Sequence, residues 1–170
     1  RFLKTARGSA TNSTMNHESS KVESALFEYI FRTTEIAAAL WVHICFFETT
    51  LRSVIHSCLQ EEYSNPMWWS IAGLLKNNDA SRIGKVILRL KNRGVKINSR
   101  ILVENLPMSF WVELLSGSYH NKVWKHFSKK LKNYTETREE FHRKAREIRN
   151  LRNSIAHHGP IMRQIGRAHV

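Results

Sequence analysis

The chain is poor in the residues that mark disulfide-rich, secreted or loop-rich proteins. It has two cysteines and three prolines among its 170 residues, and its seven glycines form no repeat. Cys45 and Cys58 lack CxxC spacing and lie in an apolar stretch, which disfavours both a disulfide framework and a cysteine-based metal site. We expect both thiols to be buried and reduced, and the protein to be cytoplasmic.

Acidic side chains are also scarce. The chain has 14 Asp and Glu against 27 Lys and Arg, a formal net charge of +13 at pH 7. Such an excess predicts an anionic partner, with nucleic acid ahead of a membrane surface. The longest apolar stretch, Ile36 to Phe47, is interrupted by His43. It is shorter than the roughly 20 residues that cross a bilayer, so we expect no membrane partner.

Both ends of the chain differ in composition from the middle. Residues 1–14 are polar and basic without acids, which predicts a disordered or non-native leader before Met15. Residues 165–170, Ile-Gly-Arg-Ala-His-Val, are expected to be a non-native tail. Residues 15–164 then form one helical domain.

Strand-like alternation is nearly absent, and apolar residues recur at helical spacing instead. The pattern predicts an all-α fold, a bundle of about five helices. Gly159-Pro160 is expected to end the last helix. The expected helical ranges are 20–32, 34–62, 80–91, a short helix opened by Pro107, 121–131, and a last helix from about Thr137.

The last helix carries the most informative cluster. Ile148, Leu151 and Ile155 recur at i, i+3 and i+7 and define its buried face. His157 lies about 200° further round the helix than Ile155, so it is expected to face solvent. Arg149, Asn153 and His157, each four residues apart, form one polar stripe, which Arg152 flanks.

These residue types suit RNA cleavage without a metal or cofactor. RNA supplies its own nucleophile, the 2′-hydroxyl, so a protein needs a base to remove its proton, an acid to protonate the leaving 5′-oxygen, and a cation beside the charged phosphorane. His157 suits the proton transfer, Arg152 the phosphate, and Asn153 the orientation of either. The last helix is expected to present one histidine, His157, for proton transfer. A homodimer that brings two copies of His157 into one cleft is therefore favoured. The alternative is that the histidines only interact with the helix end.

The segment from Leu151 to Ile161 resembles the LRNxxAHHxPI signature of Abi-like proteins, a family of the HEPN superfamily. The segment ending in Glu48-Thr49-Thr50-Leu51-Arg52 is similar to the family's E-x-x-L-R helix, and Phe110-Trp111 to its aromatic segment. Together these matches span about residues 25 to 162. Gly159 stands where an acidic residue is common in the signature.

The resemblance implies a HEPN-like helical bundle that dimerises and cleaves RNA through an RxxxxH motif, here Arg152 and His157 with Asn153. It implies supporting roles for His158 and Arg149, and for Glu48 and Arg52 as a polar network beside Arg152. It also implies an abortive-infection or toxin-like antiphage effector, and whether an antitoxin or another regulatory partner controls it stays open.

Two runs of basic residues extend the expected RNA surface. One run, without acids, includes Arg89 and Arg93; the other includes Lys125 and Lys129, with Trp124 and Phe127 interleaved. Basic and aromatic side chains suit phosphate contact and base stacking, although such aromatics more often belong to a core. Two other functions stay open: a non-catalytic RNA-binding or regulatory HEPN module, and a helical adaptor between proteins.

Overall fold

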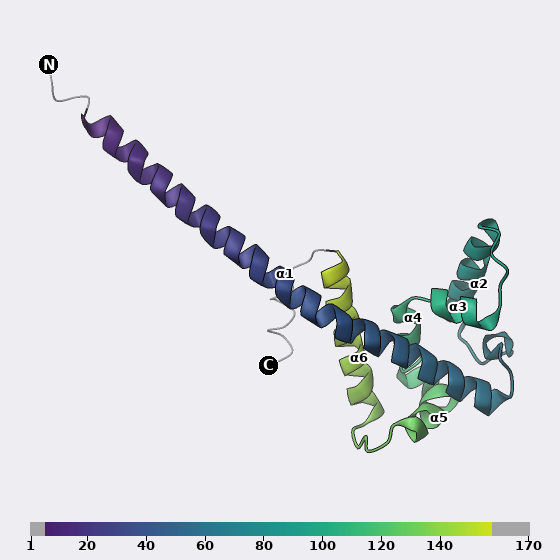
Figure 1. Cartoon of the computed structure of the whole chain (residues 1–170). Helices are drawn as coiled ribbons and strands as arrows, with labels where there is room; N and C mark the ends of the chain where they lie inside the picture. The colour runs from purple at the N-terminus through teal and green to yellow at the C-terminus, as the bar shows by residue number, and fades with distance from the viewer. Residues whose placement is uncertain (1–5, 158–170) are drawn as a thin grey trace. The chain divides into compact units, whose positions relative to one another are not determined.

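The computed structural model describes residues 6–157, and their side chains from His17 onward. This part of the chain contains helices and turns and no β-strand, which confirms the all-α class (Figure 1). The chain divides into two compact units between Val42 and His43. The helices are α1 (Ala6–Tyr63), η1 (Trp68–Ser70), α2 (Asn77–Asn92), α3 (Ser99–Asn105), α4 (Met108–Glu113), η2 (Gly117–Tyr119), the π-helical η3 (His120–Trp124), α5 (Lys125–Phe127), η4 (Ser128–Lys130) and α6 (Arg138–Ala156).

The two helices expected over residues 20–62 are one continuous helix, so the predicted break near residue 33 was wrong. The hydroxyl of Thr33 donates to the carbonyl oxygens of Tyr29 and Ile30, and that of Thr34 donates to Ile30. Threonine side chains that bond back to the preceding turn satisfy their own polar groups, so the helix continues through them. Helix α1 also includes residues 6–14 of the expected leader.

Between His17 and Tyr63, α1 is long and apolar enough to cross a membrane by length and composition alone. Its most apolar 18-residue window has a mean hydropathy of 1.4, because the helix extends beyond the Ile36–Phe47 stretch that the sequence analysis considered. Core helices of soluble proteins have the same property, so the finding does not assign a location.

The core of the second unit is aromatic. Trp68, Phe110, Trp111, Tyr119 and Phe127 are almost fully buried, together with one face of α1. Burying side chains of this size contributes roughly 1.5–3 kcal/mol each before the entropy cost of ordering them. The packed aromatics hold the carboxyl-terminal half of α1 and α6 in one hydrophobic cluster, and these two elements carry the candidate site.

Local sequence signals explain the ends of the middle helices. Helix α2 stops at Gly94, which has a φ of +71° and lets the Val95 N–H reach the carbonyl of Leu90 at 3.1 Å. Helix α3 was not predicted. Its amino-terminal cap is Asn98, whose side chain accepts a hydrogen bond from the Ile101 N–H at 2.8 Å.

Of the two thiols, Cys58 is buried as expected, but Cys45 is exposed. The expectation failed because α1 is apolar around much of its circumference there, while only one face packs on the core. Burial raises the pKa of the Cys58 thiol.

Candidate functional site

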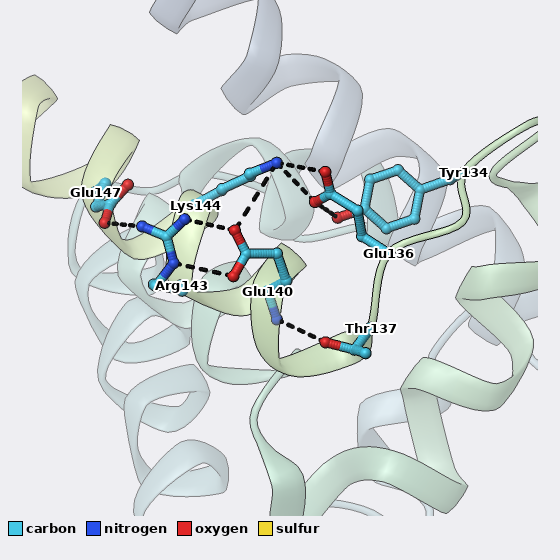
Figure 2. Close-up of polar contacts among 7 residues, drawn as sticks. All are labelled: Tyr134, Glu136, Thr137, Glu140, Arg143, Lys144 and Glu147. Atoms are coloured by element: carbon cyan, nitrogen blue, oxygen red, sulfur yellow. Dashed lines mark hydrogen bonds and ion pairs between the residues drawn. The ribbon is translucent and has the colours of Figure 1, made fainter. Parts of the chain in front are cut away.

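Helix α6 is fixed at its amino-terminal end by a network of charged and polar groups (Figure 2). The Thr137 hydroxyl caps the helix by accepting from the Glu140 N–H at 3.2 Å. Lys144 reaches back to the Glu136 carboxylate at 2.6 Å, and Arg143 bridges Glu140 and Glu147. These contacts stabilise the start of α6, while Phe141, Ala145 and Ile148 pack the helix in the core cluster.

The centre of the candidate site is Glu48, on α1. Its Oε1 lies 2.8 Å from Nη2 of Arg52, and its Oε2 lies 3.7 Å from Nε of Arg152 on α6. The side chains of Glu48 and Arg52 are only 16% and 17% exposed. One carboxylate thus holds two guanidinium groups from different helices, in a setting where charge pairs are screened less than at the surface.

Arg52 is held from a second side. Its Nη1 donates to the backbone carbonyl of Glu104, at the end of α3, at 3.1 Å. Arg52 therefore links α1 to α3 while Glu48 links α1 to α6. Glu48 is hydrogen-bonded to Arg52, and the guanidinium of Arg152 lies at ion-pair distance from the same carboxylate.

Asn153 and His157 lie just beyond Arg152 and are exposed. Helix α6 ends at Ala156, and the His157 N–H donates to the Asn153 carbonyl at 3.0 Å. A proton-transfer group and an amide thus face solvent within one and a half turns of Arg152, as the spacing predicted. Arg149 is half-buried and donates to the Asn150 side chain at 2.9 Å. His158 and Gly159 lie outside the described residues.

Within the described part of the chain, no three His, Cys, Asp or Glu side chains gather closely enough to hold a metal ion. The imidazole of His157 can transfer a proton, and the guanidinium of Arg152 can stabilise a developing negative charge.

No family model matches this chain, and neither the curated proteins nor the solved structures contain a match to it.

The basic runs are placed differently from their interleaved aromatics. Arg89, Arg93, Lys125 and Lys129 are exposed, although Arg89 also donates to the Asn105 carbonyl at 3.4 Å. Trp124 and Phe127 are buried in the core, which confirms the core alternative for these aromatics and leaves neither ring exposed for base stacking. Phosphate contact by the lysines and arginines stays a prediction.

Two polar pairs in or beside the core were not predicted from the sequence. Tyr119 donates from its hydroxyl to the Asp79 carboxylate at 2.7 Å, and burial together with this bond raises the pKa of the tyrosine. Trp68 donates from Nε1 to Nδ1 of His56 at 3.0 Å, and burial lowers the pKa of that histidine. The only sequence signals for these pairs are the acid Asp79 in the first turn of α2 and the histidine His56 on the apolar helix α1. Neither signal identifies the residue that pairs with it.

Proposed function

We propose that this protein is a metal-independent endoribonuclease of the HEPN type, acting as an abortive-infection or toxin-like effector. The observation that carries the proposal is the placement of Arg152 beside Glu48, with Asn153 and His157 exposed on the following turn of α6. A cation and an accessible imidazole on one helix supply the charge stabilisation and one of the two proton transfers that cleavage through the 2′-hydroxyl requires.

In the proposed reaction, the 2′-oxygen attacks the adjacent phosphorus while a base removes its proton. The bond to the 5′-oxygen breaks as that oxygen receives a proton, leaving a 2′,3′-cyclic phosphate. His157 takes one of the two proton transfers. Arg152 stabilises the charge on the non-bridging oxygens, sharing its guanidinium with Glu48, and Asn153 orients the phosphate or the imidazole.

A second histidine is needed for the other proton transfer. We assign it to His157 of a second copy of this chain, in a dimer that brings two α6 helices together. Mixing subunits tests the assignment. An excess of His157→Ala subunit mixed with the intact protein is expected to suppress its activity, because a mixed dimer has only one of the two histidines. A monomeric protein that cleaves at full rate would contradict the shared cleft.

The principal test is cleavage of a defined RNA in EDTA. His157→Ala is expected to abolish cleavage while leaving helicity and the unfolding midpoint unchanged, because its side chain is exposed. Arg152→Ala is expected to reduce cleavage at least 100-fold, as loss of a group stabilising the transition state does. His120→Ala and Arg146→Ala, which remove an exposed histidine and an exposed arginine elsewhere, are the matched controls.

Several outcomes would overturn the proposal. Full activity of His157→Ala would remove this residue from the mechanism. A strict magnesium requirement, or cleavage of DNA that lacks the 2′-hydroxyl, would contradict the chemistry.

One observation favours a second function, a non-catalytic RNA-binding module. Arg152 is already paired with Glu48, so its charge is partly balanced before any phosphate arrives. RNA binding without cleavage by the intact protein, unchanged in His157→Ala, would identify the protein as such a module.

A further inference from the structure

The amino-terminal helical segment, defined here as residues 17–42 of α1, presents large apolar side chains to solvent. No residue in this range is buried. Val22, Leu26, Tyr29 and Ile30 are all more than half exposed and fall on one face of the helix. Phe27 and Phe31, also exposed, widen the apolar arc. A helix that is apolar over so wide an arc is usually covered from more than one side.

This segment is also the acidic part of a basic chain. It carries Glu18, Glu23, Glu28 and Glu35 against Lys21 and Arg32, a net charge of −2. Residues 43–170 carry 22 basic and 10 acidic side chains, a net charge of +12. The segment is therefore complementary in charge to the second unit.

The second unit contains an apolar groove with two walls. A cavity of about 530 Å³ lies between the carboxyl-terminal half of α1 and the segments η4 and α6. Phe47 and Val54 line one wall, and Phe127, Leu131 and Phe141 line the other. Four of these five side chains are only half-buried, and Lys130 stands at the edge, paired with Glu61 at 2.7 Å.

We propose that the amino-terminal helical segment of one copy docks into this groove on a second copy. Two walls of apolar side chains match a helix with a wide apolar arc. The net charge of +12 on residues 43–170 complements the net charge of −2 on the segment. Each copy has one such segment and one groove, so a reciprocal exchange closes a two-fold dimer. The proposal does not depend on the ribonuclease activity, and it makes this exchange, and not the contact between α6 helices proposed for that activity, the one that holds the dimer together.

The same apolar arc is also compatible with a lipid surface. A net charge of −2 disfavours attraction to anionic lipids, and lipid binding would leave the groove uncovered. The structure therefore favours a second copy, and vesicle binding is an outcome that the experiment must separate.

Light scattering and sedimentation of the full chain at increasing concentration test the proposal first. The intact protein is expected to be a dimer, and Leu26→Glu/Ile30→Glu is expected to raise the dimer dissociation constant at least 100-fold. The control is Leu88→Glu, which places a charge on an exposed leucine of α2, outside both surfaces, and is expected to remain dimeric. The monomeric variant should retain the helicity and core unfolding midpoint of the parent.

Site-directed cross-linking identifies the surfaces. In a Cys45→Ser/Cys58→Ala background, one subunit carries Ile30→Cys and a second, larger tagged subunit carries Val54→Cys. A short bismaleimide is expected to link the two different subunits. Leu88→Cys mixed with Val54→Cys should give no such product.

Three results would overturn the proposal. The first is an intact protein that stays monomeric at high concentration. The second is a dimer that persists in Leu26→Glu/Ile30→Glu. The third is cross-linking of residue 30 to residue 30 of the other subunit and not to residue 54. Binding of the monomer to phosphatidylglycerol vesicles, lost in the double variant, would assign the segment to lipid instead.

Discussion

At the scale of single residues, one feature of α1 allows a controlled comparison. The helix has two Glu–Arg pairs at i, i+4 spacing, Glu28–Arg32 and Glu48–Arg52, with N–O distances of 2.6 and 2.8 Å. The first is largely exposed, with its arginine 72% and its glutamate 63% accessible, whereas both members of the second are less than one-fifth accessible. The two pairs have the same chemistry, but the partly buried pair is expected to contribute more to the free energy of unfolding than the exposed pair.

Glu48→Gln is expected to lower the free energy of unfolding by roughly 1–3 kcal/mol, because it leaves two guanidinium groups facing an uncharged amide. Glu28→Gln is expected to change it by less than about 0.5 kcal/mol, as exposed pairs contribute little. Urea unfolding measures both. If cleavage is present, Glu48→Gln should also lower it by misplacing Arg152. Equal effects of the two substitutions would mean that the Glu48 network contributes nothing beyond an ordinary helix pair.

His56 predicts a pH dependence. Its Nδ1 accepts the Trp68 indole N–H, so it must be unprotonated, and burial lowers the pKa of the histidine below its usual 6.5. Because protonation favours the unfolded chain, this stability is fully present above pH 6.5 and is lost as the pH falls below it. His56→Asn keeps an acceptor without a titration. Between pH 7.5 and 5.5, the unfolding midpoint of this variant should fall less than that of the parent protein. An equal fall in both proteins would contradict the assignment of this pH dependence to His56.

At the scale of elements, the start of α6 depends on one cap. Thr137→Ala removes the hydroxyl that accepts the Glu140 N–H and is expected to cost about 1 kcal/mol. Thr135→Ala, an exposed threonine two residues earlier, is the control and should cost little. Hydrogen exchange of the first turn of α6 should accelerate only in the Thr137 variant. No difference between the two would show that the charged network alone fixes this end.

Helices with a one-sided apolar pattern were predictable, and those with other signals were not. The ranges 80–91 and 137 onward matched α2 and α6, because the buried Ile83, Val86 and Leu90 of α2 and the half-buried Ile148, Leu151 and Ile155 of α6 recur at helical spacing. The expected break near Thr33 failed because hydroxyl groups bonding back to the preceding turn are invisible in a hydropathy pattern. The short α3 was missed because its evidence is a single capping asparagine.

The candidate site was predictable in part for a similar reason. The spacing along α6 placed Asn153 and His157 toward solvent, since one helix sets their relative directions. The sequence suggested Glu48 and Arg52 through resemblance, but the bond from Arg52 to a backbone carbonyl on α3 has no sequence signal. Contacts between distant elements depend on packing that the linear pattern does not contain.

At the scale of the whole molecule, the charge of +13 predicts a strong salt dependence of RNA binding. Counterions released from the phosphates make the logarithm of affinity fall linearly with the logarithm of salt concentration. In a His157→Ala background, removing Arg89 or Arg93 should reduce the slope by about 1. Arg143→Ala, whose guanidinium already binds Glu140 and Glu147, should change it little. Fluorescence anisotropy measures the slopes, and affinity independent of salt would exclude phosphate contact as the main source of binding.

The unequal placement of the two cysteines has a practical consequence. Cys45 is exposed, whereas Cys58 is buried beside the groove and has a raised thiol pKa. A thiol-specific reagent reacts with the thiolate, so it should modify Cys45 at once and Cys58 only when the helices around it part. The slow reaction thus reports the rate of local opening, and the fast one calibrates the reagent in the same molecule. Any ligand or partner that fills the groove should delay the slow reaction and leave the fast one unchanged.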